Sequence, residues 1–164
     1  MLQAAADILI MARERMANGL KELTPEQWFV QPDGFANNIA WNIGHLVWAQ
    51  QGLCYGRLGL DAPIGREKAD DLRTLYGSST SPADWTENPD TDELMRLFVE
   101  LSKQMGEDIV AGKFDNLEMP LPVEGRYPPP QSTMHGLIFN QYHEGLHFGT
   151  IGELIGFMKS ATEA

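Results

Sequence analysis

The sequence contains a single cysteine, Cys54, so it predicts no internal disulfide and no dependence on an oxidising compartment. We expect this cysteine to be buried as a small apolar residue. Basic residues are also scarce, because 12 Lys and Arg accompany 23 Asp and Glu, giving a formal net charge of -11. A surface this negative repels phosphate backbones and anionic lipid head groups, so we expect no nucleic-acid partner.

Long apolar runs are absent as well. No stretch approaches the ~20 apolar residues that a membrane-spanning helix needs. The first nine residues also lack the basic region that begins a secretion signal. We therefore predict a cytoplasmic protein with no membrane partner. The length of 164 residues is close to the commonest domain size, so we predict one domain over residues 1–164.

No segment alternates apolar and polar residues over the length of a strand, which predicts an all-α fold. Apolar residues instead recur at intervals of three and four, the spacing that places them on one face of a helix. Four segments show this pattern: residues 2–23, 37–56, 90–112 and 132–159. Each apolar face must be buried against the others, so the pattern predicts a four-helix bundle.

Two connections between these helices are longer than usual, residues 56–89 and 113–131. We expect a short extra helix within the first, near residues 65–76. The second is rich in proline and is expected to be semi-rigid and to cross one end of the bundle.

The last predicted helix contains the motif His143-Glu144-Gly145-Leu146-His147. Residues four apart lie one turn apart on nearly the same helix face, so both imidazoles can reach one metal ion. They lie on the apolar face of this helix, where a bundle ordinarily buries leucine, and buried imidazoles need partners. His45 offers a third ligand from the second helix. The alternative is a pair of core histidines that are satisfied by hydrogen bonds.

Two other candidate ligands are excluded by their positions. His135 lies about 12 Å along the helix axis from His143, too far to share one ion. Cys54 is nine residues from His45, half a turn out of phase, so its thiol should point away from the metal.

The five-residue motif also matches H-E-x-x-H, in which the glutamate is the general base of a zinc protease. One group of these proteases continues with Gly and His where this chain has Thr150 and Glu153. No strand is expected that could hold a peptide substrate. Glu144 lies about 100° around the helix from His143, so we interpret it as a solvated carboxylate or a contact to the ligands.

Two segments, N-N-I-A-W-N-I-G-H-L at residues 37–46 and H-E-G-L-H-F-G-T-I at residues 143–151, resemble the DinB/YfiT-like superfamily of bacterial proteins. Residues 23–28 are similar to the family's exit from helix one, and the resemblance spans nearly the whole chain. It implies a four-helix core with a long crossover connection, a three-histidine metal site and a homodimer. It also implies relatives that transfer or isomerise with low-molecular-weight thiols. The chain differs from the commonest signature at Phe148 and Thr150, where relatives often have Arg and Gln.

Three histidine nitrogens leave one position of a tetrahedral ion open, as in catalytic zinc sites. The resemblance favours an enzyme that uses a low-molecular-weight thiol on a small-molecule substrate. A metal-dependent hydrolase of a small substrate and a non-catalytic metal- or ligand-binding module are the alternatives. Zinc is the expected ion, with nickel or another transition metal as alternatives.

The sequence identifies no catalytic residue besides these ligands. It does offer candidates for pocket walls and for contacts to the ligands: Trp41, Asn42, Trp48, Tyr142, Glu144 and Arg126. Arg126, on the proline-rich connection, is a candidate anchor for an anion.

Overall fold

The computed structural model describes residues 1–117 and 132–162. These residues form five α-helices: α1 (Leu2–Leu20), α2 (Ile39–Gln50), α3 (Arg66–Tyr76), α4 (Thr91–Val110) and α5 (Thr133–Thr162). One π-helical turn, Gln51–Tyr55, extends α2, and short 3₁₀ turns occur at Pro25–Phe29, Gly56–Leu58 and Pro82–Asp84. No strand occurs in these described ranges, so the all-α prediction is confirmed.

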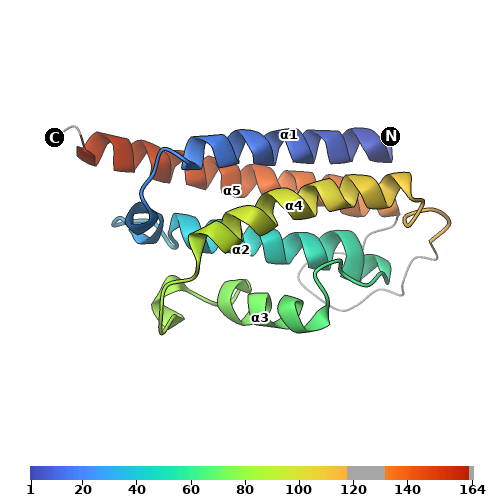
Figure 1. The fold of residues 1–164 in the computed structure, drawn as a ribbon, viewed down its shortest axis with the longest axis horizontal. Helices are drawn as coiled ribbons and strands as arrows, with labels where there is room; N and C mark the ends of the chain where they lie inside the picture. Colours follow the sequence, from blue (N-terminus) through green and yellow to red (C-terminus); the bar gives the residue numbers. More distant parts are fainter. Residues whose placement is uncertain (118–131, 163–164) are drawn as a thin grey trace.

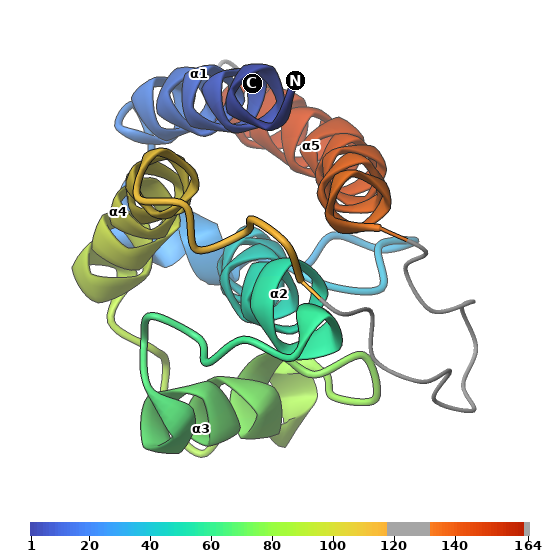
Figure 2. The same cartoon turned by 90° about the vertical axis from the view of Figure 1, so that its right-hand side faces the viewer.

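Four long helices form the bundle. Viewed from one end, α1, α4, α2 and α5 follow one another around a ring, and α3 packs on the outside of α2 (Figure 2). The bundle and the short extra helix predicted near residues 65–76 are both confirmed.

The connection between α2 and α4 is a long crossover. The colours of Figure 1 show that α2 and α4 run in the same direction, whereas α1 and α5 run in the opposite direction. Two consecutive bundle helices can be parallel only if the chain returns along the bundle between them. Helix α3 makes this return, which places residues of the crossover beside α2.

Helix α2 is the most enclosed helix of the fold, because α3, α4 and α5 all pack against it. Every residue from 39 to 47 is buried, including the polar Asn42 and His45. The helix begins where Asn38 Oδ1 accepts a hydrogen bond of 2.8 Å from the Trp41 amide, the usual role of asparagine at a helix start. Polar side chains on α2 therefore have to find partners inside the protein.

Gly44 allows α3 to approach α2 closely. A Cβ atom at this position would lie 2.5 Å from the ring of Tyr76, closer than any real contact, so the glycine leaves room for that ring. Tyr76 is the last residue of α3 and is buried. The close approach brings its backbone carbonyl to the middle of α2.

Helix α1 differs in detail from its prediction. It ends at Leu20 rather than near Leu23, and Pro25 begins a separate 3₁₀ turn. Its buried face includes Leu9, Arg13 and Ala17, so an arginine lies in the middle of the face that the sequence pattern had assigned to apolar residues.

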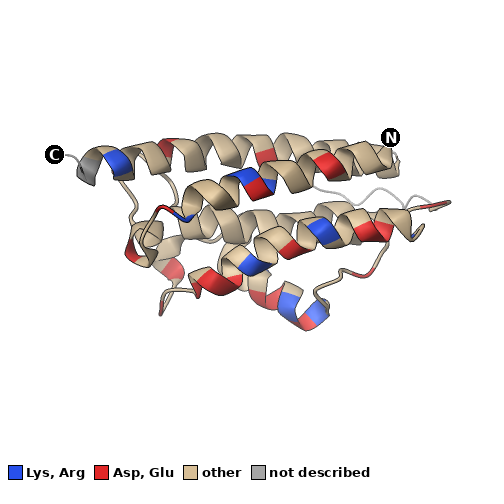
Figure 3. Ribbon diagram, turned by 45° about the horizontal axis from the view of Figure 1, so that its top comes forward, with Lys and Arg blue, Asp and Glu red and all other residues tan. Residues whose placement is uncertain are grey.

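Acidic residues are distributed over the helices with fewer basic residues among them (Figure 3). Among the described helices, none is both long and apolar enough to cross a membrane. The proline-rich residues 118–131, including Arg126, lie outside the described residues, so the predictions made for them remain predictions.

Candidate metal centre

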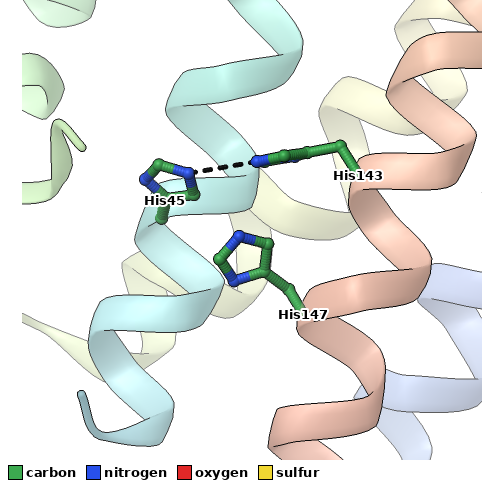
Figure 4. A group of neighbouring side chains, drawn as sticks. All are labelled: His45, His143 and His147. Carbon is green, nitrogen blue, oxygen red and sulfur yellow. Dashed lines mark hydrogen bonds between the residues drawn. The ribbon is translucent and has the colours of Figure 1, made fainter. Parts of the chain in front are cut away.

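Three histidines converge between α2 and α5. His45 extends from α2, and His143 and His147 extend from successive turns of α5 toward it (Figure 4). One ring nitrogen from each lies within 4.8 Å of the other two. The Nε2 atoms of His45 and His143 are 3.2 Å apart. The three histidines that the sequence singled out thus form one group that could hold a metal ion.

The crossover fixes the orientation of His45. Its Nδ1 atom lies 2.7 Å from the carbonyl oxygen of Tyr76. A carbonyl oxygen can only accept, so Nδ1 carries the proton and Nε2 keeps its lone pair. The indole of Trp41 stacks on the imidazole, with ring centroids 4.7 Å apart and planes within 13°. The Trp41 indole N–H in turn donates to Thr80 Oγ1 at 3.0 Å.

Asn42 orients His147 in the same way. Its amide nitrogen donates to the carbonyl oxygen of Asn38 at 2.8 Å, which leaves its Oδ1 facing His147 Nδ1 at 2.7 Å. Because that oxygen accepts, His147 Nδ1 carries the proton and Nε2 keeps its lone pair. Metal-bound histidines commonly donate their second N–H to a carbonyl or amide oxygen in this manner.

The donor set fits a divalent transition metal. Nitrogens at 2.0–2.1 Å from a tetrahedral zinc ion would be about 3.3 Å apart, close to the 3.2 Å between His45 and His143. The His143 Nδ1 atom is buried and has no hydrogen-bond partner in the described part of the chain. Because His45 Nε2 keeps its lone pair, His143 Nε2 donates the hydrogen bond between these two atoms, drawn dashed in Figure 4. A bound cation would replace that proton between the two rings.

Burial keeps these imidazoles neutral. Desolvation, with a smaller contribution from the neighbouring histidines, lowers the pKa of His143 to about 4 and that of His147 to about 3. Desolvation also lowers the pKa of His45, against the opposing effect of its hydrogen bond to the Tyr76 carbonyl. All three are therefore in the form that binds metal at neutral pH.

The other residues that the sequence suggested for the site differ in their surroundings. The Trp48 ring lies 5.4 Å from the His45 ring and forms a second aromatic wall. Tyr142 is 61 % exposed and contacts the ring of Phe139 rather than the histidines. Cys54 is fully buried, as expected, and burial raises the pKa of its thiol. No candidate group found in the described residues includes His135.

Glu144 is neither solvated nor in contact with the histidines among the described interactions. It is buried, and both of its oxygens accept from Arg13: Nε donates to Oε2 at 3.1 Å and Nη2 donates to Oε1 at 2.6 Å. Arg13 also donates to Gln50 Oε1 at 2.8 Å. We name Arg13, Gln50 and Glu144 the arginine cluster.

Sequence reasoning missed the arginine cluster, because residues 13 and 144 are far apart in the chain. One signal was available, since Arg13 is the lone charged residue at three- and four-residue spacing among Leu9, Ala17 and Leu20. A buried arginine requires an acidic partner, and Glu144 supplies it.

A pocket of about 390 Å³ opens beside His147. Asn42 and His147 form one part of its wall, so the pocket adjoins the candidate metal centre. Its other lining residues come from the segment before α2 and from α5: Gly34, Phe35, Ala36, Asn37, Leu146, Thr150 and Glu153. Thr150, one of the two positions that differ from the commonest family signature, thus lines the pocket. Phe148, the other such position, packs its ring against Phe98 in the core.

The family comparison agrees with this geometry. The model of the DinB superfamily matches residues 8–151, which include all three histidines. The chain belongs to the DinB superfamily. A search of curated proteins finds no match. Membership and the three-histidine group together fit a metal-binding DinB-like protein.

Proposed function

We propose that this DinB-superfamily protein is a metal-dependent enzyme that uses a low-molecular-weight thiol, as an S-transferase or isomerase. His45, His143 and His147 would hold one divalent ion, with zinc preferred and nickel or another transition metal as alternatives. The observation that carries the proposal is the set of three converging imidazoles, two of them held with the proton on Nδ1 so that Nε2 can bind a cation, beside a pocket of about 390 Å³.

With three imidazole ligands, the bound ion would favour the thiolate form of a thiol, which is the nucleophile in S-transfer. The chain's own residues prepare this site. Asn42 and the Tyr76 carbonyl hold the Nδ1 protons of His147 and His45, which fixes both rings. Trp41 and Trp48 cover the His45 ring and shield that side from water.

The H-E-x-x-H protease interpretation is disfavoured by the surroundings of Glu144. A general base must reach the proton that it removes and must be free to accept it. Both oxygens of Glu144 accept from the Arg13 guanidinium, and the side chain is buried within the bundle. The pocket beside the histidines lacks this carboxylate in its lining.

Two alternative functions would use the same residues. Hydrolysis of a small substrate needs the same three ligands and an activated water. A non-catalytic binding module would need the same pocket and no turnover.

The homodimer, the cytoplasmic location and the single domain remain predictions.

Cobalt substitution separates these functions. We expect a low-molecular-weight thiol to produce a sulfur-to-cobalt charge-transfer band in the cobalt-loaded protein. The His143→Ala variant should not produce the band, and the His135→Ala variant should retain it. If no thiol in a varied panel produces the band while small esters or amides are hydrolysed with metal dependence, the hydrolase function replaces this proposal. If the protein neither binds a thiol through cobalt nor hydrolyses these substrates, the non-catalytic binding module replaces this proposal.

A further inference from the structure

Among the residues that the structure describes, Glu153 is the one charged residue in the lining of the pocket beside His147. Its carboxylate forms no ion pair with any cation of the described chain, so it is available to a cationic ligand. The other lining groups are neutral, and they include the polar side chains of Asn37 and Thr150 and the apolar ones of Phe35 and Leu146. The pocket thus offers a negative group, a few neutral polar groups and an apolar wall.

The positions of these groups along α5 set the size of a ligand. Glu153 follows His147 by six residues, which separates them by about 9 Å along the helix axis. Thr150 and Leu146 lie on the turns between and beside them. Six residues also place the two about 120° apart around the helix, so this axial separation is a minimum. A ligand atom held at the three histidines and a second group beside Glu153 would therefore be joined by an apolar chain of at least roughly six carbons.

We propose that this pocket selects the end of the thiol remote from sulfur, and that Glu153 binds a protonated amine there. The inference rests on the proposed thiol function. An anionic end would meet the carboxylate of Glu153 without a compensating cation in the described lining, and an ammonium group would pair with it.

Three thiols of equal length test the charge preference: 6-aminohexanethiol, 6-mercaptohexanol and 6-mercaptohexanoate. Titration of each into the cobalt-loaded protein gives its Kd from the sulfur-to-cobalt band. We expect the aminothiol to bind about fivefold more tightly than the alcohol, and the carboxylate to bind more weakly than both. The two-carbon analogue, 2-aminoethanethiol, is too short to reach Glu153 and should show no such advantage over 2-mercaptoethanol.

The Glu153→Gln variant should bring the aminothiol and the alcohol within about twofold of each other. The matched control is Glu107→Gln, which removes one exposed carboxylate from α4 and leaves the pocket unchanged. If Glu153 acts through a local contact, the Glu107→Gln variant should still bind the aminothiol more tightly than the alcohol. A preference lost equally in both variants would show that net charge alone attracts the amine, and would overturn the inference.

Sulfur-free ligands keep this test separate from the thiol function. We expect 1-hexylamine, followed by the backbone amide NMR signals of Thr150 and Glu153, to bind the wild-type protein more tightly than hexanoate and to lose that advantage in Glu153→Gln. This result supports the pocket assignment even if no thiol binds cobalt, in which case only the proposed function fails. Cobalt bands with all three thiols, at equal affinity and unaffected by Glu153→Gln, would overturn the inference and leave the proposed function standing.

Discussion

Two adjacent residues of α5, His143 and Glu144, belong to two polar clusters of opposite character. In the arginine cluster, all five N–H donors of Arg13 are used, by Glu144, Gln50 and the carbonyl oxygens of Leu46 and Phe98. In the histidine group, His45 and His143 share one hydrogen bond between their Nε2 atoms, and His143 Nδ1 has no described partner.

The difference separates a structural cluster from a reactive one. The saturated cluster joins α1, α2, α4 and α5 and has no free group with which to bind a ligand. The unsaturated cluster keeps lone pairs available beside a pocket. Variants in the first should therefore change stability, and variants in the second should change metal affinity.

The largest effect is expected from Arg13→Met. This change leaves the buried carboxylate of Glu144 without its partner and should lower the free energy of unfolding by about 3–5 kcal/mol. Chemical denaturation measures the loss. The double variant Arg13→Met, Glu144→Leu should recover much of the stability, because neither charge remains buried. A double variant no more stable than the single one would argue against pairing as the cause.

Next in size is the loss of a ligand. His45→Ala, His143→Ala and His147→Ala should each weaken zinc affinity on the order of 100-fold or more, whereas His135→Ala should not. Competition with a chelator dye measures the affinity. The metal-free variants should stay folded, since the apolar core of the bundle does not depend on an ion. Unchanged affinity in His45→Ala would remove that residue from the site.

A smaller effect is expected at Asn42. The Asn42→Ala variant loses the oxygen that holds the proton on His147 Nδ1, and should weaken zinc affinity roughly 10–100-fold. Asn37→Ala is the matched control, because Asn37 lines the same pocket but forms no hydrogen bond to a histidine among the described residues. Equal losses in both variants would indicate a general disturbance of the pocket rather than loss of this contact.

The smallest expected effect is a decrease in the stability of the metal-free protein in mild acid. His143 and His147 have a lower pKa in the folded state than the usual 6.5, so the unfolded state binds more protons as the pH falls. Their contribution to stability is complete above pH 6.5 and is lost progressively as the pH falls toward about 3. Thermal melts at pH 7 and pH 6 should show a lower Tm at pH 6, and the double variant His143→Ala, His147→Ala should show less of this decrease.

The sequence was informative where the signal is local. The three- and four-residue spacing predicted the helices, and the positions of His143 and His147 on one apolar face predicted that they point into the bundle. The sequence did not indicate contacts between residues that are far apart in the chain. Nothing in the sequence connects Arg13 to Glu144, or identifies the Tyr76 carbonyl as the partner of His45, because a backbone group has no residue-specific signature.

Aromatic residues illustrate the same limit. Trp41 and Tyr142 were equal candidates for the walls of the site, yet Trp41 stacks on His45 and Tyr142 is largely exposed. Which face of a helix is covered depends on its neighbours. Helix α2 is enclosed by three other helices, whereas α5 keeps one side open.

The content of the site can be measured directly by elemental analysis and X-ray absorption on untagged protein purified without added metal. We expect one divalent transition-metal ion per chain, coordinated by three imidazole nitrogens and one exchangeable ligand. Protein with no stoichiometric metal that also fails to bind added zinc, or an ion fully retained by the triple His45→Ala, His143→Ala, His147→Ala variant, would contradict it.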